Sequence, residues 1–358
     1  MNRGKRCGSP RLRGSACLMA AVLGAGSMIA VAAYSGKASG VTHPAQAPNQ
    51  AAQSTTKASA RDTAGLPPFD SARAFADLKH LVSFGPRPAG SEALEKTRQW
   101  IVSRLNESGL KVDEDRFTAA TPAGNLDMAN LIVRLPGSSH DVVIVCGHYD
   151  TKRFDRFRFV GANDGASSTA LVMELARVLA NRRLPYTLWL VFFDGEEALR
   201  EQWQGTDNDY GSRHMVERLS AEGELYRVKA LILVDMIGDA KLDIHRDPAS
   251  TPWLTDLEFA TAHRLGYDRY FIKQDYPVGG DDYDPWLAAG TAAVDINDFD
   301  YGPNEHARPG DSDWNIYWHT AQDTVEHFSP QSLEIVGRVV LGMLRELENS
   351  PRIVGSRQ

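Results

Sequence analysis

The stretch YTLWLVFFDGEEA (186–198) decides the fold class of this 358-residue chain. Its first eight residues form an unbroken apolar run, which is typical of a strand covered by protein on both faces. Directly after the run come Asp194, Glu196 and Glu197, with Gly195 among them. In open α/β sheets ligands bind at the carboxyl ends of the strands, so these acidic residues stand where a site is expected.

Further strands and helices alternate along the chain on both sides of this run. Strand-like runs lie at 111–118, 127–135, 141–147, 229–236 and 291–297. Apolar residues recur at helical spacing around 75–81 and at 91–109, 169–181, 252–265 and 331–347. This alternation predicts a three-layer α/β/α sandwich around a mixed, mainly parallel central sheet.

The ends of the chain differ in composition from its middle. Residues 1–34 place a basic head before a short apolar run, which predicts a signal peptide or, if it stays uncleaved, a signal anchor. Residues 35–66 are rich in Ala, Gln, Ser, Thr and Pro, which predicts a disordered linker. We expect a folded domain at 67–350, a tail at 351–358, and an exported protein that is periplasmic or secreted. Membrane contact is expected only through an uncleaved anchor.

The charge of the chain disfavours some classes of partner, and its cysteines predict no intrachain disulfide. Residues 1–40 hold six of the 39 basic residues and no acidic one, which leaves 33 basic against 46 acidic residues and a formal charge of −13. Such an acidic body disfavours nucleic acid and anionic membranes as partners. Cys7 and Cys17 would leave with the signal, so Cys146 is expected to be a buried residue without an intrachain disulfide.

Polar clusters recur just past the ends of the predicted strands. They are His148-Tyr149-Asp150, Asn163-Asp164, residues 194–197, Asp235, Asp281-Asp282 and His319. Singly each is ordinary, because an Asp before a helix is usually an N-cap and a lone His is usually a packed or surface residue. Together they bring two histidines and at least four carboxylates to one sheet edge, which would be electrostatically costly without a cation. Imidazole and carboxylate ligands without a thiolate suit catalytic zinc, and Glu196, beside a ligating Glu197, would be free as a general acid or base.

Residues 84–319 resemble the zinc aminopeptidase family and its non-peptidase relatives, the glutaminyl cyclases. The resemblance implies metal positions at His148, Asp164, Glu197, Asp235 and His319. It also implies that Glu196 takes the place of the family's proton-shuttling glutamate, and that substrates are the N-termini of peptides or proteins.

Several motifs resemble the cyclases more than the peptidases. They are HYDTK (148–152), RFVGAND (158–164), FFDGEEA (192–198), YGSRH (210–214), DDYDPWL (281–287) and YWHT (317–320). The resemblance implies that Trp203 and Trp318 wall the pocket for the glutamine side chain, although core packing is the commoner role of a Trp. Two features depart from the pattern: Gly147 replaces a cysteine that forms a disulfide in animal cyclases, and NDGASS (163–168) partly resembles the peptidases.

As a glutaminyl-peptide cyclotransferase, the enzyme would convert an N-terminal Gln to pyroglutamate and release ammonia. The resemblance then implies one Zn²⁺ on Asp164, Glu197 and His319. Glu196 would shuttle the proton, and Asp281 together with Asp235 would hold the shuttle and the substrate nitrogen in place.

The alternative is an aminopeptidase that hydrolyses N-terminal residues with two zinc ions. The second ion would bind His148 and Asp235, with Asp164 bridging both ions. A non-catalytic ectodomain ranks last, because such relatives are expected to have lost metal ligands and here every ligand position is filled.

Overall fold

The computed structural model describes residues 65–308 and 311–354. The predicted export signal at 1–34, and the predicted linker up to residue 64, lie outside these residues. Within them, no helix combines the length and the hydrophobicity needed to cross a bilayer.

A six-stranded mixed sheet forms the centre of the domain, in the order β1-β2-β4-β3-β5-β8. The strands are β1 (Val112–Thr121), β2 (Gly124–Leu135), β3 (Val142–His148), β4 (Thr187–Phe193), β5 (Val228–Asp235) and β8 (Ala293–Asn297). β1 and β2 form an antiparallel hairpin at one edge, whereas β4, β3, β5 and β8 run parallel to one another. The prediction of a mixed, mainly parallel sheet is therefore confirmed.

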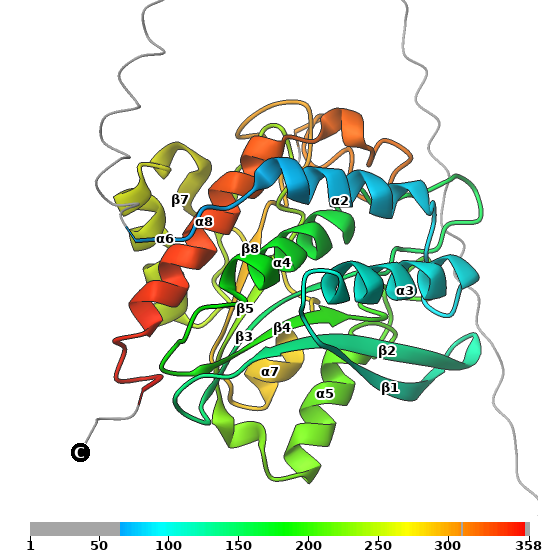
Figure 1. The fold of residues 1–358 in the computed structure, drawn as a ribbon. Coiled ribbons are helices and arrows are strands. Elements are labelled where there is room, and N and C mark those ends of the chain that lie inside the picture. Colours follow the sequence, from blue (N-terminus) through cyan, green and yellow to red (C-terminus); the bar gives the residue numbers. More distant parts are fainter. Residues whose placement is uncertain (1–64, 309–310, 355–358) are drawn as a thin grey trace, which may run out of the picture. The chain divides into compact units, whose positions relative to one another are not determined.

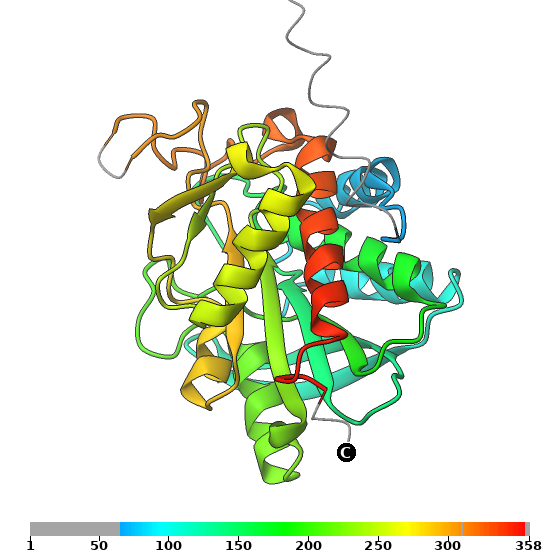
Figure 2. The ribbon, with the colours of Figure 1, turned by 90° about the vertical axis from the view of Figure 1, so that its left-hand side faces the viewer.

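Helices cover both faces of this sheet (Figure 1). One face carries α2 (Ser71–Ser83), α3 (Glu92–Asn106), α4 (Ala166–Leu179), α6 (Pro252–Leu265) and α8 (Pro330–Leu347). The other carries α5 (Tyr210–Ala221) and α7 (Asp284–Ala288). Figure 2 shows α6 and α8 side by side on their face of the sheet. Two separate apolar clusters fill the spaces between the layers, so the three-layer sandwich is confirmed.

Local sequence explains where the helices begin. The side chain of Asp70 accepts a hydrogen bond from the N–H of Arg73, and that of Ser91 accepts one from Leu94, which caps α2 and α3. β3 and β4 are buried along nearly their whole length, as their continuous apolar runs predict. Cys146 lies in β3 as a buried free thiol, as predicted.

Several elements, most of them short, were not predicted from the sequence. They are α5, α7, a small two-stranded sheet of β6 (Ile244–Arg246) and β7 (Phe271–Asp275), and the 3₁₀ turns η2 (Leu225–Arg227), η3 (Asp268–Tyr270) and η4 (Val325–His327). Most are too brief to show a period in hydrophobicity. At the carboxyl end, Ile353 lies inside the segment predicted to be a tail, and its side chain is fully buried.

Candidate metal centre and active site

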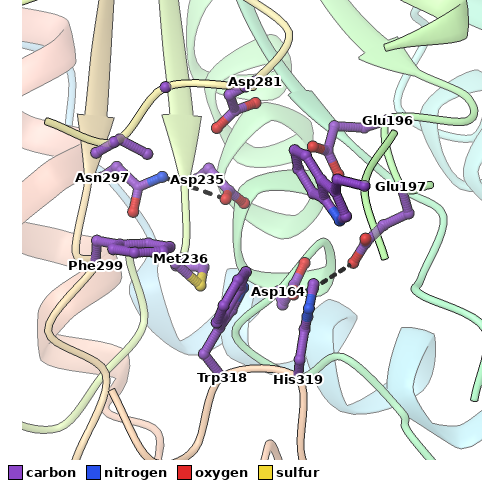
Figure 3. Close-up of a pocket in the computed structure, with 14 residues that line it drawn as sticks. Asp164, Glu196, Glu197, Asp235, Met236, Asp281, Asn297, Phe299, Trp318 and His319 are labelled. Atoms are coloured by element: carbon purple, nitrogen blue, oxygen red, sulfur yellow. Dashed lines mark hydrogen bonds and ion pairs between the residues drawn. The ribbon is translucent and has the colours of Figure 1, made fainter. Parts of the chain in front are cut away.

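The predicted site residues gather at the carboxyl edge of the parallel strands. His148 ends β3, Asp164 precedes α4, Glu196 and Glu197 follow β4, Asp235 ends β5, Asp281 precedes α7, and His319 lies between β8 and α8. With the exception of His148, these residues line one pocket of about 200 Å³, together with Trp203 and Trp318 (Figure 3). His148 is fully buried and contacts the lining residues Asp164 and Asp235.

Three of these side chains form a compact set of ligand atoms. His319 Nε2 lies 3.0 Å from Glu197 Oε1 and 3.3 Å from Asp164 Oδ2. One ligand atom from each of the three residues lies within 4.8 Å of the other two. Two carboxylates and one imidazole, converging on a pocket, match a catalytic zinc site with one position left for substrate.

Two buried carboxylate oxygens in this set support the fit of a cation. Asp164 Oδ2 lies 3.3 Å from His319 Nε2 and Glu197 Oε2 lies 3.6 Å from Lys152 Nζ, but neither oxygen accepts a well-formed hydrogen bond from the described residues. A buried carboxylate oxygen without a donor is costly unless a cation compensates it. The residues present therefore fit a zinc ion in donor type, number and spacing.

The loops around the ligands are held by backbone hydrogen bonds to acidic side chains. The carboxylate of Asp323 accepts the N–H groups of Asn163 and Asp164 at 2.7 and 3.1 Å. Gly165, which follows Asp164, has φ of 90°, and a Cβ there would lie 2.6 Å from the carbonyl oxygen of Asp150. This tight turn needs glycine, because other residues rarely adopt that backbone conformation.

The turn after β4 separates Glu196 from Glu197. Asp150 accepts the N–H of Glu196 with one carboxylate oxygen and that of Glu197 with the other, at 3.2 and 3.3 Å. Glu197 then reaches His319, as the dashed line in Figure 3 shows, whereas Glu196 Oε2 lies 3.8 Å from His148 Nδ1. The two adjacent glutamates therefore have different neighbours.

A second set of possible ligands shares Asp164 with the first. His148 Nε2 lies 3.2 Å from Asp164 Oδ1 and 3.2 Å from Asp235 Oδ1, and the three residues form another compact group. The second-metal candidates of the sequence analysis are thus close together, and the geometry leaves room for the two-ion arrangement.

Two acids in the pocket, Glu196 and Asp281, have raised pKa values that suit proton transfer. Burial raises the pKa of Glu196 well above its usual range; His148 opposes this shift, and Glu197 and Asp281 add to it. Burial also raises the pKa of Asp281, with further contributions from Asp295 and Asp235. A carboxyl whose pKa is shifted toward neutrality can both accept and return a proton near pH 7.

The acidic neighbours of His319 raise its pKa. Burial lowers the pKa of His319, but Glu197 and Asp164 more than offset it and raise the pKa to about 9. For Asp164, burial raises the pKa, but the neighbouring imidazoles of His148 and His319 outweigh it, and the pKa falls below its usual range. The set therefore attracts positive charge strongly.

Both predicted tryptophans lie in the pocket wall. Trp318 stacks on His319 with ring centroids 4.0 Å apart, and it meets Phe299 edge-on at 5.1 Å. Trp203 is 38 % exposed, and Lys152 Nζ lies 5.3 Å from its ring. Their placement agrees with pocket walls rather than with core packing.

Sequence reasoning missed several residues of the site. Lys152 is fully buried, with Nζ 3.6 Å from Glu197 Oε2 and donating to the carbonyl oxygen of Ala198. Asn297 and Phe299 line the pocket opposite Glu197 in Figure 3. Asn297 follows directly from the rule that strand ends carry the site, since it is the last residue of β8.

Comparison with known proteins agrees with this geometry. The model of peptidase family M28 matches residues 130–344. A solved glutaminyl cyclase from an Acidobacteriales bacterium is 38 % identical, with a TM-score of 0.72, over 85 % of this chain and 98 % of that one.

Two further proteins extend the comparison. The solved glutaminyl cyclase of Porphyromonas gingivalis is 27 % identical with a TM-score of 0.69, over 78 % of this chain and 98 % of that one. The glutaminyl-peptide cyclotransferase-like protein of Bos taurus is 29 % identical over 289 residues, which are 73 % of this chain and 72 % of the bovine one. The chain therefore belongs to peptidase family M28 and, within it, to the glutaminyl cyclases.

Proposed function

We propose that this protein is a zinc-dependent glutaminyl-peptide cyclotransferase, which converts the N-terminal Gln of peptides or proteins to pyroglutamate and releases ammonia. The observation that carries the proposal is one small pocket that combines three ligand residues, two acids of raised pKa and two tryptophans. Its volume of about 200 Å³ suits a single side chain better than a longer peptide segment.

Asp164, Glu197 and His319 would hold one Zn²⁺. The ion would supply Lewis-acid polarisation of the substrate's γ-carboxamide oxygen. Trp203 and Trp318 would orient the side chain between their rings, so that its carboxamide faces the ligand residues.

Glu196 would act on the substrate's own α-amine, whose pKa is about 7.7 in model compounds. The amine nitrogen forms a bond to the γ-carboxamide carbon while Glu196 accepts one of its protons. The bond from that carbon to the amide nitrogen then breaks, Glu196 returns the proton, and ammonia leaves. Asp281 and Asp235 would hold the amine and the shuttle in place. The α-amine and the γ-carboxamide carbon belong to the same residue, so the closure of a five-membered ring keeps the two reacting groups close together.

An aminopeptidase remains the second candidate, because His148, Asp164 and Asp235 form a complete second ligand set. A single assay separates the two. Incubating a Gln-initiated peptide with zinc-loaded protein should reduce the peptide's mass by one ammonia molecule. A loss of a whole residue would instead establish the peptidase and refute the proposal.

We also propose that the protein is exported to the periplasm or secreted, on the basis of the basic and apolar composition of residues 1–34. Cell fractionation with N-terminal sequencing tests this. A cytosolic protein that still carries Met1 would contradict export, and a membrane-bound one with Met1 would establish the uncleaved anchor.

A further inference from the structure

Asn297 lies beside one of the acids assigned to the reaction. It is the last residue of β8, directly opposite Asp235 at the end of β5, and its side chain is buried in the pocket wall. Asn297 Nδ2 lies 3.4 Å from Asp235 Oδ2 (Figure 3). A carboxylate accepts hydrogen bonds, so the amide nitrogen, not the amide oxygen, must face Asp235.

With this contact, Asp235 has a neighbouring donor at each of its two carboxylate oxygens. Asp235 Oδ1 lies 3.2 Å from His148 Nε2, so each carboxylate oxygen has one neighbouring donor. Without Asn297, Asp235 would keep only the contact with His148 and could rotate toward it. Asn297 therefore holds Asp235 in the orientation that faces the pocket.

The other end of the Asn297 amide is unpaired. Its Oδ1 is buried and has no hydrogen-bond partner in the described part of the chain. Asn130, a buried asparagine in β2, uses both ends of its amide: Nδ2 donates to the carbonyl oxygen of Gly211, and Oδ1 accepts the N–H of Asp194. Buried amide oxygens are nearly always paired, so an unpaired one in a pocket wall indicates a ligand donor.

We propose that Asn297 positions the amino end of the substrate: Nδ2 holds Asp235, and Oδ1 accepts an N–H of the substrate's α-amine. This inference rests on the proposed function. An amine nitrogen carries two N–H groups and an ammonium three, and each oxygen of Asp235 already faces one donor, His148 or Asn297. Asp235 and Asn297 Oδ1 together offer the α-amine adjacent acceptors, one charged and one neutral.

Two variants of nearly equal size separate the two ends of the amide. Asn297→Asp keeps an acceptor but loses the donor toward Asp235, and Asn297→Leu loses both. We expect kcat for a Gln-initiated peptide to fall about 10- to 100-fold in both variants, because each loses a hydrogen bond to a charged group. KM should stay within about twofold of wild type in Asn297→Asp and rise several-fold in Asn297→Leu, where the substrate's acceptor is gone.

Zinc content and melting temperature, measured on the same zinc-loaded full-length proteins, exclude a merely structural role. Ile296→Val is the matched control, because its side chain packs in the core on the other face of β8. It should lower the melting temperature slightly and leave kcat and KM unchanged.

The outcomes distinguish this inference from the proposed function. If the wild-type protein released no ammonia, the proposed function itself would fail. If wild type is active and Asn297→Leu matches it in kcat and KM, the inference is overturned. A Leu variant that loses zinc also overturns it, since Asn297 would then support the metal set. Should Asn297→Leu not fold, an Asn297→Asp protein with wild-type kcat is sufficient to refute the positioning role.

Discussion

Glu196 and Glu197 are neighbours in sequence, but the residues around them predict that the same substitution affects zinc binding differently at the two positions. Glu196→Gln keeps size and hydrogen bonding but cannot accept a proton, so turnover should fall by about 10²- to 10⁴-fold while zinc stays bound. Glu197→Gln weakens a ligand next to His319 and should lose zinc as well as rate. Metal content and turnover of both variants provide the comparison. Near wild-type turnover in Glu196→Gln would remove it from the mechanism and leave Asp281 as the next candidate for the shuttle.

His319 contributes the only imidazole of the first ligand set. His319→Ala should abolish zinc retention and activity together, because two carboxylates alone bind zinc weakly. His263→Ala is a suitable control, since His263 is exposed on α6, pairs with Asp268 and does not line the pocket. Full zinc in dialysed His319→Ala protein would show that the ligand assignment is wrong.

At the scale of elements, β3 and α4 approach each other unusually closely. A Cβ added at Gly147 would lie 2.5 Å from Ser168 Cβ and 2.9 Å from the carbonyl oxygen of Val234. This close packing also explains why a cysteine would not fit at Gly147 in this chain. The short distance holds His148, at the end of β3, against the loop that carries Asp164.

Gly147→Ala should therefore destabilise the protein by about 1 to 3 kcal/mol through overpacking. It should also lower zinc affinity, because α4 must move away from β3. Denaturant titration and zinc binding check both effects. Cys146→Ala, one residue earlier, is the control and should leave zinc affinity unchanged; equal zinc affinities in all three proteins would contradict the coupling of α4 to the site.

Some helices, strands and site residues could be predicted from the sequence, and others could not. β3, β4, β5 and α8 were predictable, because long buried runs and helical periodicity are strong signals. α7, β6 and β7 were not, since they span at most five residues and depend on tertiary contacts. In the site, His and acidic residues at strand ends were recognisable by type. Lys152 was not recognised, because Lys is usually a surface residue. Asn297 could be recognised only from its place at the end of a strand, since Asn has no characteristic spacing as a positioning group.

Burial raises the pKa of several acids across the domain. Glu258 is an example far from the ligand residues in sequence: burial raises its pKa well above the usual range, with Arg246 opposing and Asp247 adding to the shift. Burial likewise raises the pKa of Asp300 to about 7, with contributions from Asp243 and Asp239. The folded state therefore binds more protons than the unfolded chain near neutral pH.

The sign of the pH effect follows from this difference. A pKa raised by folding gives stability that is fully present below the unfolded value, about 4.3 for Glu, and is lost as pH rises through the folded pKa. The free energy of unfolding should therefore decrease from pH 5.5 to pH 8. Glu258→Gln should make that decrease smaller, by at most about 1.4 kcal/mol for each pH unit between the unfolded and the folded pKa of Glu258. Denaturant titrations of both proteins across this range measure it, and parallel pH profiles would rule out Glu258 as a contributor.

The stacking of Trp318 on His319 gives the molecule an optical reporter of its own metal site. Indole fluorescence is sensitive to whether an adjacent imidazole is protonated, and zinc binding would replace the proton on His319. Titrating zinc should thus change the emission of the protein before any substrate is added. The chain has seven tryptophans, so Trp318→Phe identifies the source: the emission change should disappear while zinc still binds. The occupancy of the site could then be followed in real time without a label.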